Sequence, residues 1–200
     1  VLPIRKQVAL DNFTAAFPDE DPTQLRRTVG ELVMGYVDLA LRRPVKLENM
    51  QLVQKGGICL AGHGGAWDLA LCAAAQAVPT TIFVKLPSNP LAAWWITRMR
   101  ERSNIELLSP TGSAFAAIRA LKRGRLLVFV MDQRFNDGIR VPFFGRPART
   151  SRGFALLLHR TRAPTFGAWQ WRGTDGKHRL RIEALHPEIP DDLDTAVTAL

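Results

Sequence analysis

The stretch Leu60-Ala-Gly-His-Gly-Gly-Ala-Trp-Asp68 decides the fold of this chain. An apolar run from Ile58 to Ala61 leads into a glycine-rich turn, and a helix-forming stretch begins at Ala66. A strand, a tight turn and a helix in this order are typical of an α/β protein. His63 then stands at the carboxyl end of a strand, which is where open α/β sheets bind their ligands.

The spacing of His63 and Asp68 suits a general base. Asp68 falls in the first turn of the expected helix, so its carboxylate can reach back towards the imidazole. A carboxylate that holds a histidine fixes the tautomer and stabilises the imidazolium. Taken alone, the same spacing also fits a turn histidine followed by an aspartate that the helix dipole favours.

Strands alternate with helices over most of the chain. The sequence predicts strands at 58–61, 80–85, 105–108, 126–131, 165–171 and 178–185, and helices at about 23–43, 66–77, 90–102, 113–123 and 151–160. This alternation predicts one α/β domain with a central, mostly parallel mixed sheet and helices on both faces. The continuous apolar run at 126–131 indicates a strand buried on both faces. His63 and Asp132 then lie at the same edge of the sheet.

Three further segments carry expectations. Apolar residues at helical spacing in the first helix favour packing on the core, with a membrane-surface helix as the alternative. The members of that apolar stripe are Leu25, Val29, Leu32, Val33, Tyr36, Val37, Ala40 and Leu41. The segment from Arg134 to Arg149 is rich in Gly, Pro and Arg and predicts a functional loop without regular structure. Residues 191–200 predict the start of a helix.

Composition bounds the kind of protein. A hydrophobic fraction of 46% and a mean hydropathy of −0.04 describe a globular chain, and 200 residues suit one domain. The net charge of +9 predicts anionic partners: nucleic acid, anionic lipid head groups or an acidic carrier protein. Cys59 and Cys72 stand in apolar contexts and predict buried, reduced thiols rather than a disulfide or a metal site. No apolar stretch is long enough for a transmembrane helix.

Four blocks of sequence together point to a family. The blocks are His63-Gly-Gly-Ala-Trp-Asp68, the segment Arg100 to Leu108, Asp132-Gln133 with Val141-Pro-Phe-Phe-Gly145 and Pro147, Ala148 and Thr150, and Thr161-Arg-Ala-Pro164. They resemble blocks of the bacterial lipid A biosynthesis acyltransferases, the late lauroyl or myristoyl acyltransferases of the lysophospholipid acyltransferase superfamily. The resemblance covers about residues 5 to 195. Asn104 departs from it, because the family usually has Gly there.

The resemblance implies a glycerolipid-acyltransferase-like α/β domain over residues 1–200, without the family's N-terminal membrane anchor and C-terminal segment. It implies transfer of a fatty acyl chain from an acyl carrier protein thioester to a hydroxyl of a phosphorylated glucosamine lipid. The work would be done at the cytoplasmic face of the inner membrane, with no metal or bound cofactor. His63 would be the general base and Asp68 its orienting partner. Arg100, Asp132 and Gln133 would bind substrate and organise the site.

The chemistry of acyl transfer fits these residues. Attack of a hydroxyl on a thioester needs a base, which His63 supplies near neutral pH without an acyl-enzyme. Backbone N–H groups of Gly64 and Gly65 are candidates for stabilising the oxyanion. Asp132 could pair with Arg100 across the site. The loop arginines, Arg149 among them, suit phosphate and an acidic carrier protein.

Some expectations remain divided at this point. Of Phe143 and Phe144, one is expected in the core and the other in the acyl groove. The other histidines, His159, His178 and His186, have no partner pattern and are expected to be structural. A first competing function keeps the fold and uses another lysolipid or glycerolipid acceptor. A second is a basic module that binds nucleic acid or anionic membrane without catalysis, but RNA-binding patterns are missing and no nucleic-acid partner is expected.

Overall fold

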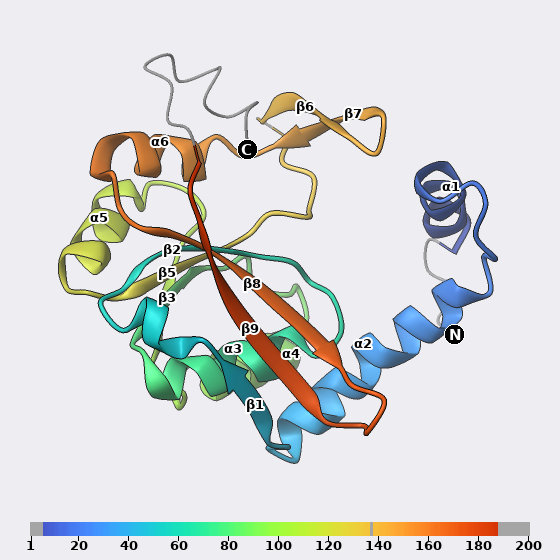
Figure 1. Cartoon of the computed structure of the whole chain (residues 1–200), viewed down its shortest axis with the longest axis horizontal. Coiled ribbons are helices and arrows are strands. Elements are labelled where there is room, and N and C mark those ends of the chain that lie inside the picture. Colours follow the sequence, from blue (N-terminus) through green and yellow to red (C-terminus); the bar gives the residue numbers. More distant parts are fainter. Residues whose placement is uncertain (1–5, 137, 188–200) are drawn as a thin grey trace.

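The computed structural model describes residues 6–136 and 138–187, and it is built around a seven-stranded sheet (Figure 1). The strand order is β1-β9-β8-β2-β5-β3-β4. These strands are β1 (Val45–Glu48), β2 (Gly57–Ala61), β3 (Thr80–Phe83), β4 (Ile105–Leu108), β5 (Leu126–Val130), β8 (Thr165–Arg172) and β9 (His178–Leu185). A separate hairpin pairs β6 (Ile139–Phe143) with β7 (Arg146–Thr150).

The sheet is mixed and mostly parallel, as predicted. Strands β8, β2, β5, β3 and β4 run parallel to one another, whereas β9 is antiparallel to β8 and parallel to β1. The helices of the described residues are α1 (Lys6–Ala16), α2 (Gln24–Ala40), α3 (Trp67–Ala77), α4 (Pro90–Glu101), α5 (Ala114–Lys122) and α6 (Gly153–Thr161), with a short 3-10 helix η1 (Met50–Val53). None of these helices is long and apolar enough to cross a bilayer.

Helices cover both faces of the sheet, because its central strands are apolar on both sides. In β5, Leu126 and Val128 point into the core beneath α3, while Leu127 and Phe129 point into the core beneath α5 and α6. Figure 1 shows α3 and α4 on one side of the sheet and α5 and α6 on the other. Each such side chain contributes about 1.5–3 kcal/mol through burial. The expectation of a doubly buried strand is confirmed.

The chain leaves β2 and β5 in opposite directions at the carboxyl edge of the sheet. β2 continues into α3 on one face, and β5 is followed by the hairpin and then by α6 on the other face. The two strands are hydrogen-bonded neighbours, with Ala61 paired to Val130. Neighbouring strands whose connections diverge open a crevice at their carboxyl ends. His63 and Asp132 each follow two residues after that last pair.

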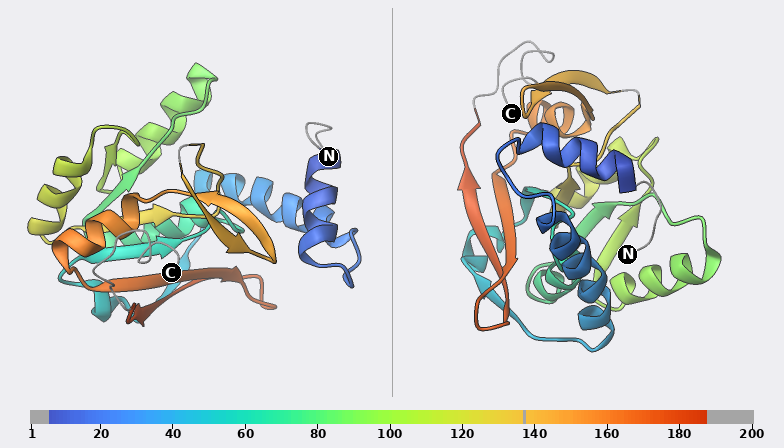
Figure 2. Two further views of the ribbon diagram at one scale, coloured as in Figure 1. Left: turned by 90° about the horizontal axis from the view of Figure 1, so that it is seen from above. Right: turned by 90° about the vertical axis from the view of Figure 1, so that its right-hand side faces the viewer.

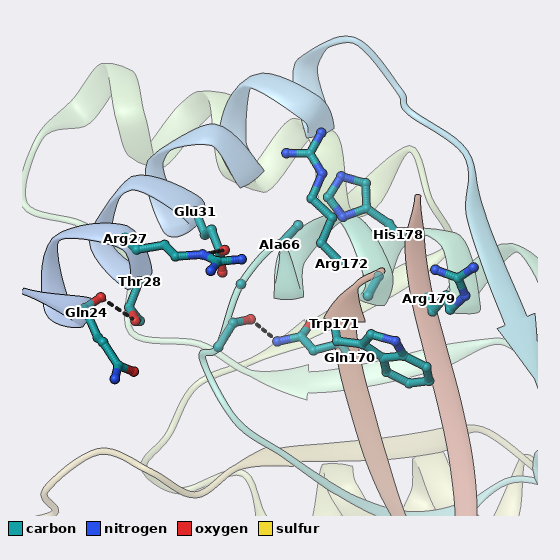
Figure 3. Close-up of a pocket in the computed structure, with 13 residues that line it drawn as sticks. Gln24, Arg27, Thr28, Glu31, Ala66, Gln170, Trp171, Arg172, His178 and Arg179 are labelled. Atoms are coloured by element: carbon teal, nitrogen blue, oxygen red, sulfur yellow. Dashed lines mark hydrogen bonds and ion pairs between the residues drawn. The ribbon is translucent and has the colours of Figure 1, made fainter. Parts of the chain in front are cut away.

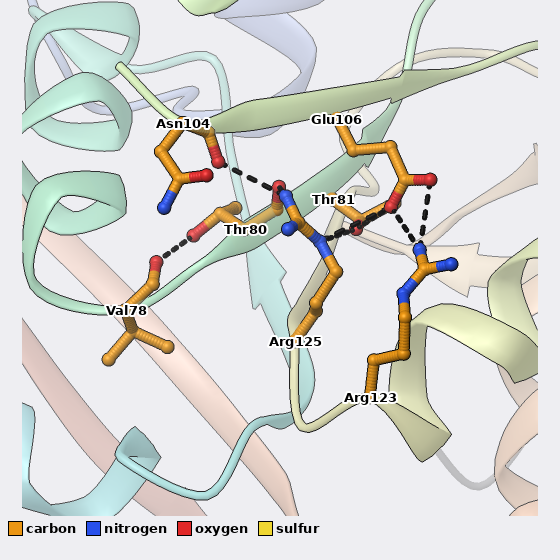
Figure 4. Close-up of polar contacts among 7 residues, drawn as sticks. All are labelled: Val78, Thr80, Thr81, Asn104, Glu106, Arg123 and Arg125. Carbon is orange, nitrogen blue, oxygen red and sulfur yellow. Dashed lines mark hydrogen bonds and ion pairs between the residues drawn. The ribbon is translucent and has the colours of Figure 1, made fainter.

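At the amino ends of β3, β4 and β5, opposite the crevice, a polar network joins the strands (Figure 4). Glu106 of β4 accepts hydrogen bonds from Arg123, at 2.7 and 3.0 Å, and from the Thr81 hydroxyl at 3.0 Å. Arg125 donates to the Thr81 hydroxyl at 2.8 Å and to the carbonyls of Thr80 and Asn104. These contacts join β3, β4 and the start of β5, so this edge has a structural role.

The segment 134–149 is partly regular, which corrects the prediction of an irregular loop. β6 and β7 are joined through Phe144 and Gly145, whose φ angles of 48° and 72° are both positive. Two positive φ values are typical of a type I′ hairpin turn. Pro142 and Pro147 face each other in the ribbon, and prolines are tolerated at strand edges because such positions need no N–H. The many Gly and Pro residues concealed this hairpin in the sequence.

Three other short elements, α1, β1 and the 3-10 helix η1, were missed in the sequence. The sequence pattern predicts no helix or strand at any of them. Figure 2 shows α1 away from the sheet, beside the β6–β7 hairpin, where the rings of Phe17 and Phe144 are 5.2 Å apart. α1 buries no residue, so its sequence has no strong apolar pattern from which a helix could be predicted. The predicted helix at 191–200 lies outside the described residues.

Helix α2 packs through a different face from the one expected. Its buried residues are Gly35, Asp38 and Leu39, whereas Val33 and Val37 of the predicted stripe are 53% and 43% exposed. Contact is close at Gly35, where an added Cβ would lie 2.8 Å from the Ala66 Cα. The absence of a side chain at Gly35 selects the buried face. Of the apolar stripe, Leu25 and Leu32 are partly buried, and Val29, Val33, Tyr36, Val37 and Leu41 remain exposed.

Candidate active site

His63 and Asp132 form a hydrogen-bonded pair at the switch point between β2 and β5. The imidazole Nδ1 lies 2.6 Å from Asp132 Oδ1, and the backbone N–H of His63 donates to Asp132 Oδ2 at 2.7 Å. One carboxylate thus holds both the ring and the backbone of the same histidine. The two exposed side chains meet across 69 residues of sequence, because the parallel pairing of β2 and β5 brings their ends together.

This contact fixes the tautomer of His63. Because a carboxylate accepts, the proton of the neutral ring lies on Nδ1, and Nε2 carries the free lone pair. The Gln133 side-chain amide is 3.3 Å from His63 Nε2 and donates to that lone pair. Both side chains are reachable from solvent, since the His63 side chain is 29% exposed and the Asp132 side chain 40%. The ring therefore presents a basic nitrogen towards the crevice.

The Asp132 carboxyl is held in its charged form. Burial raises its pKa, but hydrogen bonds from the imidazole and the amide of His63 outweigh burial, so the pKa lies below the ordinary value. Asp132 therefore remains a carboxylate at neutral pH and stabilises a positive charge on His63.

Asp68 does not hold His63 in this structure, and this corrects the sequence expectation. Its carboxylate accepts two hydrogen bonds from Arg100, at 2.8 Å to Nε and 3.0 Å to the terminal nitrogen. Both side chains are buried, at 4% and 6% exposed. The suggested pairing of Arg100 with Asp132 is wrong for the same reason. Helix α3 directs Asp68 inwards, to α4, whereas His63 turns towards the end of β5.

Trp67 connects the buried ion pair to the imidazole. Its ring packs edge-on against His63, with the ring centres 4.8 Å apart. The guanidinium of Arg100 lies 5.1 Å from the centre of the Trp67 ring, which is a cation–π contact. Burial, followed by the charge of Asp68, raises the pKa of the neighbouring Tyr36. The Asp68–Arg100 pair therefore supports the ring against which His63 rests.

The glycine turn is adapted to these contacts. A Cβ on Gly62 would lie 3.2 Å from Asp132 Oδ2, so the glycine leaves room for the carboxylate. Gly65 has a φ of +51°, a left-handed conformation that glycine adopts without strain. The side-chain amide of Gln170 donates to the carbonyl of Gly64 and, at 3.4 Å, to that of Gly62. The turn is thus held from β5 on one side and from β8 on the other.

Two backbone donors of this turn are free. The N–H groups of Gly64 and Gly65 donate no hydrogen bond within the described part of the chain. They precede the N-terminus of α3, where the helix dipole favours negative charge. This arrangement can stabilise an anion that forms beside His63.

The hairpin residues are placed differently from the expectation. Phe143 and Phe144 are 55% and 52% exposed, so the prediction that one of them enters the core is wrong. Their rings pack against each other at 4.8 Å. Arg149 is exposed and donates to the carbonyl of Asn136 at 2.6 Å. No hydrogen bond or ring contact joins these three described side chains to His63.

The two cysteine thiols are not suited to act as nucleophiles. Cys59 and Cys72 are free and buried, as predicted. Burial raises the pKa of Cys59 to about 12 and is the main cause that raises the pKa of Cys72 to about 11. Both are therefore protonated at neutral pH and supply no thiolate nucleophile. Within residues 6–136 and 138–187, no group of three His, Cys, Asp or Glu side chains is arranged to hold a metal ion.

Two site residues escaped the sequence analysis. Gln170 is three positions beyond Gly167, which pairs with Leu60, so it stands level with His63 at the strand ends. The sequence feature that could have indicated Gln170 is its position as a polar residue between Trp169 and Trp171, near the end of a predicted strand. His178, expected to lack a partner, is 2.9 Å from the buried Asp38. That pair spans 140 residues and left no local pattern.

Asn104, which stands where the resembled family usually has glycine, adopts a glycine-like backbone conformation. Its φ is +65°, so it adopts the left-handed conformation that the glycine usual at this position would favour. Asparagine is among the non-glycine residues that tolerate this region best. The turn between α4 and β4 is therefore preserved.

Comparison with known families gives one result. The family model described as bacterial lipid A biosynthesis acyltransferase matches residues 44–199, well over half of the chain. The match includes the glycine turn, Arg100, the Asp132-Gln133 pair and β8. A comparison with curated proteins gives no significant match.

Proposed function

Because this chain belongs to the bacterial lipid A biosynthesis acyltransferase family, we propose that it transfers a fatty acyl chain from an acyl carrier protein thioester to a hydroxyl of a lipid A precursor. Family membership implies acyltransferase activity. The observation that supports this reaction at His63 is the Asp132 contact to Nδ1, which leaves Nε2 as the proton-accepting nitrogen at the topological switch point.

In the proposed reaction, His63 Nε2 accepts the proton of the attacking hydroxyl. The hydroxyl oxygen bonds to the thioester carbon and gives a tetrahedral oxyanion. Asp132 stabilises the imidazolium that forms. Collapse of the tetrahedral species breaks the C–S bond, and His63 returns the proton to the leaving thiolate. Removal of such a base lowers rates by about 10²–10⁴-fold.

The oxyanion needs fixed donors, and the free N–H groups of Gly64 and Gly65 are proposed for this role. Gln133 would release Nε2 when the acceptor hydroxyl binds, because the amide occupies the direction from which that hydroxyl must approach. Its side-chain N–H₂ group is then available to the substrate. The protonated, buried cysteines favour direct transfer without an acyl-enzyme.

The proposed partners are an acyl carrier protein, a phosphorylated glucosamine lipid and the membrane surface. The net charge of +9 suits an acidic carrier and anionic head groups. The exposed apolar residues Val29, Val33 and Val37 of α2 suit a position on the cytoplasmic face of the inner membrane. Neither a metal nor a bound cofactor is part of the proposed mechanism.

The test measures transfer of a labelled acyl group from acyl carrier protein to a lipid A precursor. His63→Ala is expected to lose at least about 10²-fold in turnover, while His186→Ala, a change at an exposed histidine, retains it. Equal turnover by the wild type and His63→Ala would remove His63 as the base. A lysophospholipid used in parallel as the acceptor distinguishes the alternative substrate, since only the true acceptor is acylated in a His63-dependent way.

A further inference from the structure

A cavity of about 390 Å³ adjoins the glycine turn at Gly64 and Gly65 (Figure 3). One wall is the first half of α2, with Arg27 and Glu31, and the other is the β8–β9 hairpin, with Arg172 and His178. Gly64, Gly65 and Ala66 belong to its lining. Figure 3 shows Arg27 reaching from α2 towards the turn and Gln170 reaching towards it from β8. The cavity thus borders the glycine turn that follows His63.

The cavity lining is basic. Its charged side chains are three arginines, Arg27, Arg172 and Arg179, against one carboxylate, Glu31. Arg27 uses only its Nε for Glu31, at 3.1 Å, and its side chain is 85% exposed. Its two terminal nitrogens are therefore available to a ligand. Arg179 is held by Asp175 through both terminal nitrogens, so its donors and its charge are already paired, and Arg27 and Arg172 remain as the binding arginines.

Arg172 is positioned at the cavity by its neighbours. Its Nε donates to the Gly176 carbonyl at 2.9 Å. One terminal nitrogen lies 4.0 Å from the buried Asp38 carboxylate, whose nearer partner is His178 at 2.9 Å. Arg43 is a further cation 3.9 Å from Asp38. Because His178 and Arg43 also lie close to the Asp38 carboxylate and compensate its charge, most N–H donors of Arg172 remain available to a ligand.

We propose that this cavity binds the phosphate group of a substrate, held between Arg27 and Arg172. Guanidinium groups bind phosphate oxygens in pairs of charge-assisted hydrogen bonds. The inference rests on the proposed function, since the cavity is lined by Gly64 and Gly65, whose N–H groups are the proposed oxyanion donors. Two substrates carry suitable phosphates: the phosphorylated sugar of the acceptor and the phosphopantetheine of the carrier protein.

The test is calorimetric titration with two separate probes, glucosamine 1-phosphate and 4′-phosphopantetheine. One of them is expected to bind, and its dissociation constant rises about tenfold in Arg27→Gln and in Arg172→Ala. Glu31→Gln removes the negative charge of the cavity and tightens binding by about threefold. Arg119→Ala, an exposed arginine on α5, removes the same charge far from the cavity and leaves binding unchanged. The probe that responds identifies the source of the phosphate.

Binding and turnover separate the two proposals. If neither probe binds, or if binding is indifferent to both Arg27→Gln and Arg172→Ala, the phosphate site is refuted. Arg27→Gln is decisive even if Arg172→Ala misfolds, because Arg27 is on the surface of α2. Arginine-dependent probe binding supports the cavity also when turnover survives in His63→Ala, and that pair of results would refute only the proposed mechanism.

Discussion

His63 meets a carboxylate that lies 69 positions away, while the carboxylate five positions away turns inward. The two acids therefore divide two tasks. Asp132 contacts the His63 imidazole, and Asp68 holds Arg100, on which the Trp67 ring rests. A change at either acid should lower activity, but by different routes that measurements of stability separate.

Asp132→Asn is expected to lower kcat by about 10²–10⁴-fold with little change in the free energy of unfolding. The neutral amide cannot stabilise the imidazolium and can donate to Nδ1, which favours the wrong tautomer. The measurement is steady-state acyl transfer together with urea unfolding. Asp19→Asn, at an exposed position, is the control. Retention of full kcat in Asp132→Asn would show that the pair plays no part in the base step.

Asp68→Asn is expected to lower the free energy of unfolding by about 3–5 kcal/mol, because it leaves a buried guanidinium without its counter-charge. Both side chains of this pair are almost fully buried, so solvent screens the loss very little. Urea denaturation measures it. The double variant Asp68→Asn/Arg100→Leu should recover part of the loss, since it removes the unpaired charge as well. A double variant no more stable than Asp68→Asn would contradict this account.

At the scale of elements, the order of strands and helices could be predicted from the sequence, because β2 and β5 are apolar runs and β3 is rich in β-branched residues, each bounded by turns. The location of the site at one edge also followed from the alternation of strands and helices. The carboxylate that pairs with His63 could not be predicted in this way. A pattern of near neighbours favoured Asp68, and only the orientation of α3 decides between the two acids. The β6–β7 hairpin was missed because its turn begins with Phe144, a residue that rarely adopts positive φ.

The buried face of α2 could not be predicted from the sequence either, since apolar periodicity indicates burial of Val33 and Val37 rather than of Gly35. The close approach of Gly35 to Ala66 is what decides it. Gly35→Ala is expected to destabilise the fold by about 1–3 kcal/mol, because the new methyl group overlaps the backbone at the start of α3.

Gly30→Ala on the same helix is the matched control. Nothing lies within 4 Å of a Cβ at Gly30, so the substitution should stabilise α2 by up to about 1 kcal/mol through helix propensity alone. Opposite shifts of the two melting temperatures would support the observed face. Equal shifts would contradict it.

At the scale of the whole molecule, the carboxylates that tie strands together make stability depend on pH. Burial raises the pKa of Glu106, but hydrogen bonds from Thr81 and Arg123 and the charges of Arg123 and Arg125 outweigh burial and lower it. A carboxyl with a lowered pKa in the folded state stabilises the protein above its ordinary pKa, about 4.3 for Glu. That contribution is lost as the pH falls through the lowered value.

The urea midpoint should therefore fall between pH 5 and pH 3, and it should fall less in Glu106→Gln, which has already lost the ionised form. Glu183→Gln, an exposed carboxylate on β9, should keep the wild-type dependence. If Glu106→Gln retained the full pH dependence, the network at this edge of the sheet would not be a source of acid sensitivity.

The parallel pairing of β2 with β5 has a consequence for when the candidate active site forms. Residues 57–61 must close a loop of about 70 residues before they meet residues 126–130, and long-range parallel contacts form slowly. During synthesis, His63 emerges well before Asp132, the carboxylate that orients its ring. The oriented imidazole is therefore a product of late folding, and no nascent chain that ends before residue 132 holds it.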